Sequence, residues 1–415
     1  MIQPGVNGSG NEEEARLPKR DWILLPLISV ATIVAIAVCT ESIADRMFRA
    51  SKTLGEDCMV FKDPVVGIKG IPHSVCQEKI AEGEQVVYRF NGSGYRSDTE
   101  FGPKLPGTFR IVMVGSSFTL GARVRIEDAV STRLSSELSR RTGRKIEVYN
   151  EGIAGSGGYL RMVAMRFQDA FAANPNMILW MLNSWDIQHA SSEGPVDRVD
   201  ILPAPKGQTM RRVKEALAAK SISQISNALE DIAVDRIRLS LNSGNVSTMV
   251  RHFAYDSQSL YLKLYLKQGD VAGFLKAQPT PEWQSRLQLF NNYAAELEKR
   301  AKAAGVPWVA VLVPLRAQAA MASMGEWPAG YDPYKLDDEV RSIITSHGGI
   351  YIDIFPEVRN TPNPERYYYP VEGHPDPGGC LLLSQFLAHH LTAGAFPPLT
   401  VSTQTQALSG PERRP

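Results

Sequence analysis

Residues 109–121 read FRIVMVGSSFTLG, a mostly apolar run that ends in a glycine and two serines before a second glycine. Continuous apolar runs bounded by turn residues are typical of strands that are buried on both faces of a parallel sheet. In such a sheet, ligands bind beyond the carboxyl ends of the strands. The run therefore predicts a buried strand that carries Ser116 and Ser117 to the edge of the sheet where a site is expected.

The segments after this run alternate between short apolar stretches and helical patterns. Further strands are expected at 145–150, 177–182, 307–314 and 349–355, and helices at 129–141, 159–172, 335–347 and 378–391, with another from about 282. Strands that alternate with helices in this way indicate βαβ units. We predict an α/β fold with three layers, α/β/α, around a mostly parallel sheet.

Composition divides the rest of the chain. We expect a cytoplasmic tail at 1–21, a transmembrane helix at 22–39, an extracytoplasmic extension at 41–107, the α/β domain at 108–395 and a flexible tail at 396–415. A helical insertion at about 192–281 interrupts the domain, and its apolar residues at helical spacing are Val213, Leu217, Ile222, Ile225, Leu229 and Ile232. A helix packed on the domain is the favoured interpretation. A lid or a docking face for a partner is the alternative.

Residues 22–39 carry no charged side chain and are just long enough to cross a bilayer. A cleaved signal peptide usually has a shorter apolar run behind a short basic start, so we expect an uncleaved anchor. A signal peptide cleaved at an A-x-A pattern and a lipoprotein cysteine at Cys39 are the alternatives. Lys19 and Arg20 lie close to the first end of the span and favour a cytoplasmic N-terminus. The domain would then be periplasmic or otherwise extracytoplasmic.

Cysteine positions are compatible with that location. Cys58 and Cys76 lie in one polar segment beyond the span, and they would close a disulfide in an oxidising compartment. Two unrelated thiols are an equally weighted alternative on spacing alone.

The charge balance excludes a class of partners. The 415 residues include 45 Lys and Arg against 44 Asp and Glu, so no field of one sign attracts nucleic acid. The histidines, including His389 and His390, show no metal-ligand spacing, and we expect neither a metal nor a cofactor. A nucleotide loop is also disfavoured, because Gly121 is followed by Ala122 and Arg123 where a P-loop has lysine and a hydroxyl residue.

Ser117 and His374 are the candidate reactive pair. A serine hydroxyl is a weak nucleophile that needs a base beside it, and histidine has the pKa for this task. His374 lies in the loop VEGHPDPGG just before the last predicted helix. The alternative for Ser116 and Ser117 is that they cap the following turn, since serine is a favoured cap.

Four blocks of the chain resemble the SGNH (GDSL-type) hydrolase and acyltransferase superfamily, from about Val86 to Leu391. RIVMVGSSFTLGARV is similar to the first block and YNEGIAGSGGY to the second, and EGHPDPGG is similar to the last. The resemblance implies that Ser117 is the nucleophile, that His374 is the base, and that backbone N–H groups of Ser117 and Gly155 form the oxyanion hole.

The chain departs from the family pattern at several positions. Ser116 stands where the family has aspartate, and Trp185 stands where the third block has an asparagine that donates to the oxyanion. Asn183 is the candidate substitute for that asparagine. Glu372 stands in place of the acid that orients the histidine, and Asp376 is the spare candidate.

The resemblance implies a serine esterase or O-acyltransferase that acts on ester (acetyl) groups through an acyl-enzyme on Ser117. The expected substrate is a small ester or an acylated, exported carbohydrate, with a protein of polysaccharide export as a further partner. A catalytically inactive carbohydrate-binding or assembly protein of an envelope polysaccharide system, with the same fold, is the alternative.

Overall fold

The computed structural model describes residues 20–51, 54, 58–63, 65–153, 159–189 and 244–401. Most of the predicted helical insertion, with its apolar stripe from Val213 to Ile232, lies outside the described residues. Residues 1–19 and 402–415 of the two predicted tails also lie outside them.

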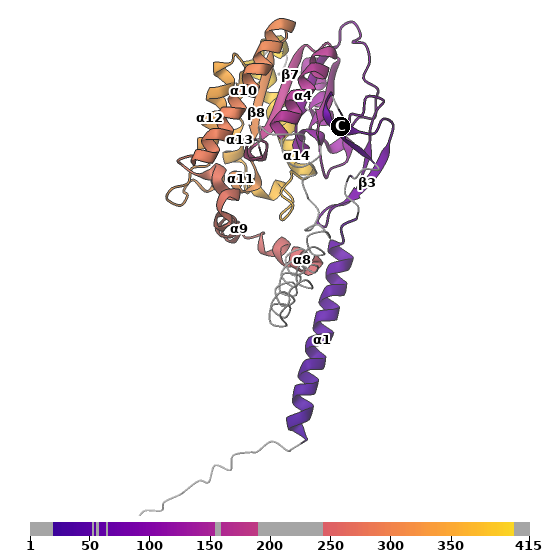
Figure 1. Ribbon diagram of the computed structural model, residues 1–415, viewed down its shortest axis with the longest axis vertical. Coiled ribbons are helices and arrows are strands. Elements are labelled where there is room, and N and C mark those ends of the chain that lie inside the picture. The colour runs from indigo at the N-terminus through magenta and orange to yellow at the C-terminus, as the bar shows by residue number, and fades with distance from the viewer. Residues whose placement is uncertain are drawn as a thin grey trace, which may run out of the picture.

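A five-stranded parallel sheet forms the centre of the α/β domain (Figure 1). Its strands are β5 (Phe109–Gly115), β6 (Ile146–Gly152), β7 (Met177–Asn183), β8 (Trp308–Val313) and β9 (Ile350–Ile352), in the order β6-β5-β7-β8-β9. Every residue of β5, β7 and β8 is buried, as expected for central strands that are covered on both faces. The predicted α/β fold is confirmed.

The direction of each connection assigns the main helices to the two faces of the sheet. These helices are α3 (Val130–Thr142), α4 (Tyr159–Ala172), α10 (Pro281–Ala304), α12 (Lys335–Ser346) and α14 (Pro377–His390). Right-handed crossovers place α3 on one face, and α4, α10 and α12 on the other, because the chain moves from β5 to β6 in the opposite direction to its later steps. Contacts agree, since α10 packs on α4 and α12, and α14 packs on α3.

Shorter helices and helical turns complete the domain. They are α2 (Ser117–Leu120), η1 (Ile126–Asp128), α5 (Ser184–Gln188), α8 (Asn245–Ala254), α9 (Gln258–Tyr265), η2 (Leu266–Leu275), α11 (Arg316–Met324), α13 (Phe355–Asn360), η3 (Pro364–Tyr367), η4 (Leu391–Ala395) and η5 (Pro397–Leu399). Of these, α2 and α5 begin directly after β5 and β7, so they sit at the carboxyl edge of the sheet.

That edge contains the point where the strand order reverses. The chain leaves β5 for β6 at one edge, then crosses back past β5 to β7 and continues to β8 and β9. Two neighbouring connections that leave in opposite directions open a crevice at the carboxyl ends of the strands. Ser117 follows β5 and Asn183 ends β7, so both turns meet at this crevice.

The N-terminal region consists of one long helix and two hairpins. Helix α1 (Asp21–Phe48) projects away from the domain (Figure 1). Its segment Trp22–Phe48, which contains an 18-residue window with a mean hydropathy of 2.6, is long and apolar enough to cross a membrane, a criterion that a signal sequence also meets. The hairpins pair β1 (Met59–Asp63) with β2 (Gly67–Gly70) and β3 (Val75–Lys79) with β4 (Gln85–Arg89). A disulfide between Cys58 and Cys76 joins the two hairpins.

Two elements run past the boundaries that the sequence suggested. Helix α1 continues past Cys39 to Phe48, because residues 40–48 contain no glycine or proline and because Ala44 and Phe48 are buried where α1 packs on α8. The predicted flexible tail begins too early, because Phe396 and Leu399 are both buried in the domain core.

Gly115 is required by the close approach of three segments at the end of β5. A Cβ at this position would collide with the Thr119 side chain and the Met181 carbonyl oxygen. We expect Gly115→Ala to lower the free energy of unfolding by about 1–3 kcal/mol, the usual cost of overpacking a core. Urea titration measures the change, and Gly102→Ala is the matched control, because a Cβ at Gly102 meets nothing within 4 Å. Equal losses in both variants would contradict the steric argument.

Candidate active site

Three side chains from two distant parts of the chain form one line of hydrogen bonds. The Ser117 Oγ lies 2.7 Å from His374 Nε2, and His374 Nδ1 lies 2.8 Å from Glu372 Oε2. His374 is 8% exposed, so its ring is shielded from bulk water while Ser117 is only partly buried. The structure thus brings together the predicted nucleophile, base and acid.

The loop between η3 and α14 holds His374 and Glu372 in place. The Tyr369 N–H donates to the His374 carbonyl oxygen at 2.9 Å, and the Gly373 N–H donates to the Tyr369 carbonyl oxygen at 2.9 Å. Glu372 Oε2 also accepts the backbone N–H of His374 at 3.0 Å. The longer glutamate side chain therefore folds back over its own loop, which is how it reaches the imidazole from this backbone position.

Asp376, the spare acid, has a different role. Its Oδ1 accepts the backbone N–H of Gly379 at 2.8 Å, and it is the N-cap of α14. A capping aspartate satisfies one of the free N–H groups at the start of a helix. The geometry therefore pairs His374 with Glu372 and assigns Asp376 to the helix.

Arg123 controls the charge of Glu372. Arg123 Nε donates to Glu372 Oε1 at 2.8 Å, and the same guanidinium pairs with Glu78. Burial alone would raise the pKa of Glu372, but His374 and Arg123 together lower it to about 2. Glu372 is therefore a carboxylate at neutral pH, and it can accept a hydrogen bond from the Nδ1–H of His374.

The N-terminal hairpin β3–β4 completes this network, which the sequence alone did not indicate. Glu78 on β3 is buried and accepts the hydroxyl of Tyr88 from β4 at 2.9 Å. The Tyr88 oxygen in turn accepts the backbone N–H of Arg123 at 2.9 Å, and Arg123 has a left-handed backbone with φ 72°. A left-handed backbone is uncommon for arginine, and it marks Arg123 as an unusual residue at the end of the first sequence block. The sequence does not show this conformation.

The predicted oxyanion donors are only partly described. Gly155 lies outside the described residues. Asn183 Nδ2 donates to Ser116 Oγ at 3.0 Å, and its Oδ1 accepts the Trp185 N–H at 2.9 Å. Asn183 therefore holds Ser116 and starts α5. The Ser116 side chain makes no capping bond to α2, so the structure contradicts the interpretation of Ser116 as a side-chain cap.

Aromatic rings surround His374. Phe118 lies 5.1 Å and Trp185 lies 5.7 Å from the imidazole, between ring centroids. Trp185, at the position of the family asparagine, thus packs beside the base. Its ring also lies next to Gly373, where a Cβ would come within 3.3 Å of it.

Asp186 is a buried carboxyl group beneath the site. It is 1% exposed, and its Oδ2 accepts the Asn183 N–H at 2.9 Å. Burial raises the pKa of Asp186 to about 7, although the Ser116 hydroxyl and the Asn183 N–H favour its charged form.

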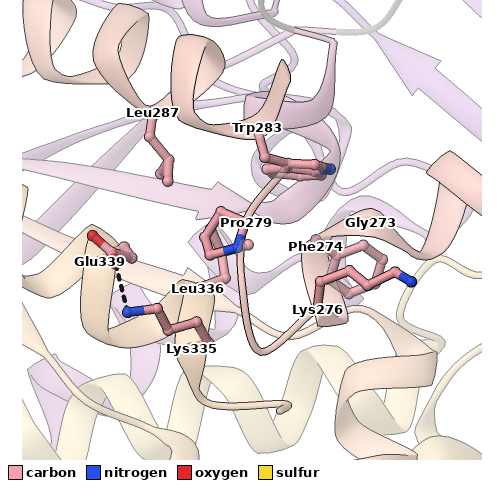
Figure 2. Close-up of a pocket in the computed structure, with 9 residues that line it drawn as sticks. All are labelled: Gly273, Phe274, Lys276, Pro279, Trp283, Leu287, Lys335, Leu336 and Glu339. Atoms are coloured by element: carbon pink, nitrogen blue, oxygen red, sulfur yellow. Dashed lines mark ion pairs between the residues drawn. The ribbon is translucent and has the colours of Figure 1, made fainter. Parts of the chain in front are cut away.

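A separate hollow lies between η2, α10 and α12 (Figure 2). Trp283 and Gly273 lie at one end, and a 2.7 Å ion pair between Lys335 and Glu339 lies at the other. No residue of the Ser117 line contributes to it, so we assign it no part in the chemistry of the site. Within the described ranges, no group of three or more histidine, cysteine, aspartate or glutamate side chains has the arrangement of a metal site.

Asp186 makes stability depend on pH in a defined direction. Its pKa is about 7 in the folded protein and about 3.9 in an unfolded chain, so the folded state binds more protons between these values. Stability therefore falls as pH rises through this window, by up to about 1.4 kcal/mol per pH unit from this group. Asp186→Asn keeps an acceptor for Asn183 and should flatten that part of the dependence.

Urea unfolding of wild type and Asp186→Asn from pH 4 to 8 measures the difference. Asp338→Asn, at an exposed position of α12, is the control and should run parallel to wild type. A wild-type minus Asp186→Asn difference that does not change with pH would contradict the assignment.

No protein-family model and no curated protein matches the chain. Among solved structures, it is similar to the lipase/acylhydrolase from Enterococcus faecalis, with 13% identity, coverage of 68% of this chain and 95% of that chain, and a TM-score of 0.33. It is also similar to the acetylxylan esterase Axe2 from Geobacillus stearothermophilus, with 12% identity, coverage of 71% and 96%, and a TM-score of 0.36.

A GDSL-like lipase from Parabacteroides merdae shows the same level of similarity, with 13% identity, coverage of 71% of this chain and 99% of that chain, and a TM-score of 0.34. All three likenesses have TM-scores below 0.4 at 12–13% identity.

Proposed function

We propose that this chain is a serine esterase or O-acyltransferase that forms an acyl-enzyme on Ser117. The observation that carries the proposal is the unbroken line of hydrogen bonds from Ser117 through His374 to Glu372, at 2.7 and 2.8 Å. A hydroxyl, an imidazole and a carboxylate in this order are the groups that acyl transfer through serine requires.

The geometry supports a stepwise proton transfer. His374 Nε2 takes the Ser117 proton as the hydroxyl oxygen attacks the ester carbonyl, and the imidazolium then gives that proton to the departing alcohol oxygen. In the second step, His374 takes a proton from water or from another hydroxyl, and the oxygen of that group attacks the acyl-enzyme carbonyl. The bond between Ser117 Oγ and the acyl carbon then breaks, and the imidazolium returns the proton to Ser117 Oγ. Glu372 holds Nδ1–H toward itself throughout and stabilises the imidazolium. Arg123 supports this by keeping Glu372 ionised.

The developing oxyanion needs fixed donors. The backbone N–H groups of Ser117 and Gly155 are proposed for this role on the family resemblance, with Asn183 as a further donor. Losing one such donor typically costs a factor of about 100 to 1,000 in rate.

The proposed substrate is an ester of a carbohydrate outside the cytoplasm. The family resemblance supports the acetyl ester, and the chain's own features support the location. The apolar helix α1 would anchor the protein in a membrane, and the disulfide between Cys58 and Cys76 suits an oxidising compartment such as the periplasm. Either water or a sugar hydroxyl can accept the acyl group in this scheme, so hydrolysis and transfer share the same first step.

A binding protein without turnover is the second candidate. The observation that favours it is Trp185, which occupies the position where the family has an oxyanion donor and packs against His374 instead. In that case the hydrogen-bonded line would remain, but Ser117 would not be acylated.

Removal of the Ser117 hydroxyl separates the two candidates. The full chain in detergent should hydrolyse aryl acetates and should be labelled by a fluorophosphonate probe. Ser117→Ala should lose labelling and at least about 1,000-fold in kcat, because the nucleophile is gone. Ser136→Ala, at an exposed position of α3, is the control and should behave as wild type. Equal rates in wild type and Ser117→Ala would reject the nucleophile.

Substitution of the two candidate acids, Glu372 and Asp376, should affect kcat to very different extents. Glu372→Gln should lower kcat by roughly 100- to 10,000-fold, because an amide no longer enforces the Nδ1–H form of His374. Asp376→Asn should stay within a few fold of wild type, since asparagine is an equally good N-cap. Steady-state kinetics on the same aryl ester compare them, and the reverse order would move the acid to Asp376.

A further inference from the structure

Glu82, like Glu78, is a buried carboxylate of the N-terminal hairpin β3–β4. It lies against the segment from Val371 to His374, which we call the catalytic loop. It lies in the turn between β3 and β4, and its side chain is only 1% exposed. Its Oε2 accepts the backbone N–H of Glu372 at 2.8 Å and that of Val371 at 2.9 Å. One donor belongs to the proposed acid itself, and the other belongs to the residue just before it.

These contacts hold the start of the segment from Val371 to His374. The segment is a loop, and its N–H groups would otherwise be free to turn toward water. A charged acceptor forms stronger hydrogen bonds than a neutral one, so Glu82 gives this loop a firm point of attachment. A shift of about 1 Å in Glu372 would lengthen its bond to His374 and cost a large part of the rate.

The second carboxylate oxygen of Glu82, Oε1, is hydrogen-bonded to helix α8. His252 Nδ1 on α8 lies 2.7 Å from Glu82 Oε1. The His252 ring packs edge-on against Phe48 at 5.2 Å, and Asn245 at the start of α8 donates to Asp45 of α1 at 3.0 Å. In Figure 1, α8 lies beside the domain end of α1. A continuous set of contacts therefore runs from the end of the candidate membrane span to the catalytic loop.

One hairpin thus supports Glu372 from two directions. Glu78 acts on its side chain through Arg123, and Glu82 acts on its backbone N–H. A buried carboxylate is costly unless its oxygens are bonded, and Glu82 has three partners from two separate elements. Its burial is therefore matched by contacts that all concern the catalytic loop and α8.

We propose that Glu82 is a positioning residue for the Glu372–His374 pair and that His252 holds Glu82 in place from α8. This rests on the proposed function, since the pair is catalytic only if Ser117 is the nucleophile. Glu82 itself contacts no reacting atom. The proposal also gives the N-terminal hairpin and the end of α1 a part in the alignment of the site.

Glu82→Gln in the full chain in detergent tests the proposal. The amide keeps the volume of the side chain but loses its charge, so the loop should be held less firmly. We expect kcat on an aryl acetate to fall about tenfold with KM within twofold, because alignment and not binding is lost. Glu84→Gln is the matched control, since Glu84 lies in the same turn with an exposed side chain.

A spectroscopic measurement separates this inference from the proposed function. The proton on His374 Nδ1, bonded to Glu372, should give a low-field NMR resonance in wild type and in Glu84→Gln. That resonance should weaken or shift in Glu82→Gln, whether or not the protein turns over an ester. Assignment uses His374→Gln, which should lack the resonance.

The outcomes decide between the possibilities. If Glu82→Gln folds and has the wild-type kcat and an unchanged resonance, the proposal is overturned. If Ser117→Ala keeps the wild-type kcat, only the proposed nucleophile is overturned. If Glu82→Gln does not fold, His252→Ala decides, because it leaves the carboxylate in place. A kcat loss of about threefold or more with a shifted resonance then supports the proposal, and wild-type values of both overturn it.

Discussion

The ion pair between Arg123 and Glu372 is the interaction on which the candidate site depends. A carboxylate in a shielded loop would tend to take up a proton, and a protonated Glu372 would no longer accept the Nδ1–H of His374. His374 and the Arg123 guanidinium together prevent this, and the guanidinium is held by Glu78, whose second oxygen accepts the Tyr88 hydroxyl. The reactive line from Ser117 to Glu372 therefore depends on Arg123 and, through it, on Glu78, whose charge comes from outside the α/β domain.

The fold brings these groups together through one topological feature. The strand order reverses between β5 and β7, which opens the crevice where Ser117 emerges and where Asn183 begins α5. The buried strand β5 ends at Gly115, where neighbouring segments leave no room for a side chain. Because the rigid strand ends where the segments are closely packed, Ser117, two residues after Gly115, is held in a defined position. A flexible loop would not hold it in this way.

The N-terminal region is more than a connection between α1 and the domain. Its hairpin β3–β4 supplies Glu78 and Glu82, which reach Glu372 through its side chain and its backbone. The disulfide between Cys58 and Cys76 ties this hairpin to the preceding one. In the proposed enzyme, the segment nearest the membrane span would therefore also align the catalytic loop.

The amino-acid sequence by itself determined the parallel α/β core, since apolar runs such as 109–115 are buried on both faces wherever they pair. It also indicated Ser117, His374 and Glu372, because they lie in blocks that resemble those of a known superfamily. The sequence could not predict the contacts of Glu78, Glu82 and Arg123 with the candidate site. A single charged residue is expected to be a solvated surface group until its partners are known. Their burial is a property of contacts between segments far apart in the chain, and so only the tertiary structure decided which carboxylates serve the site and which, like Asp376, cap a helix.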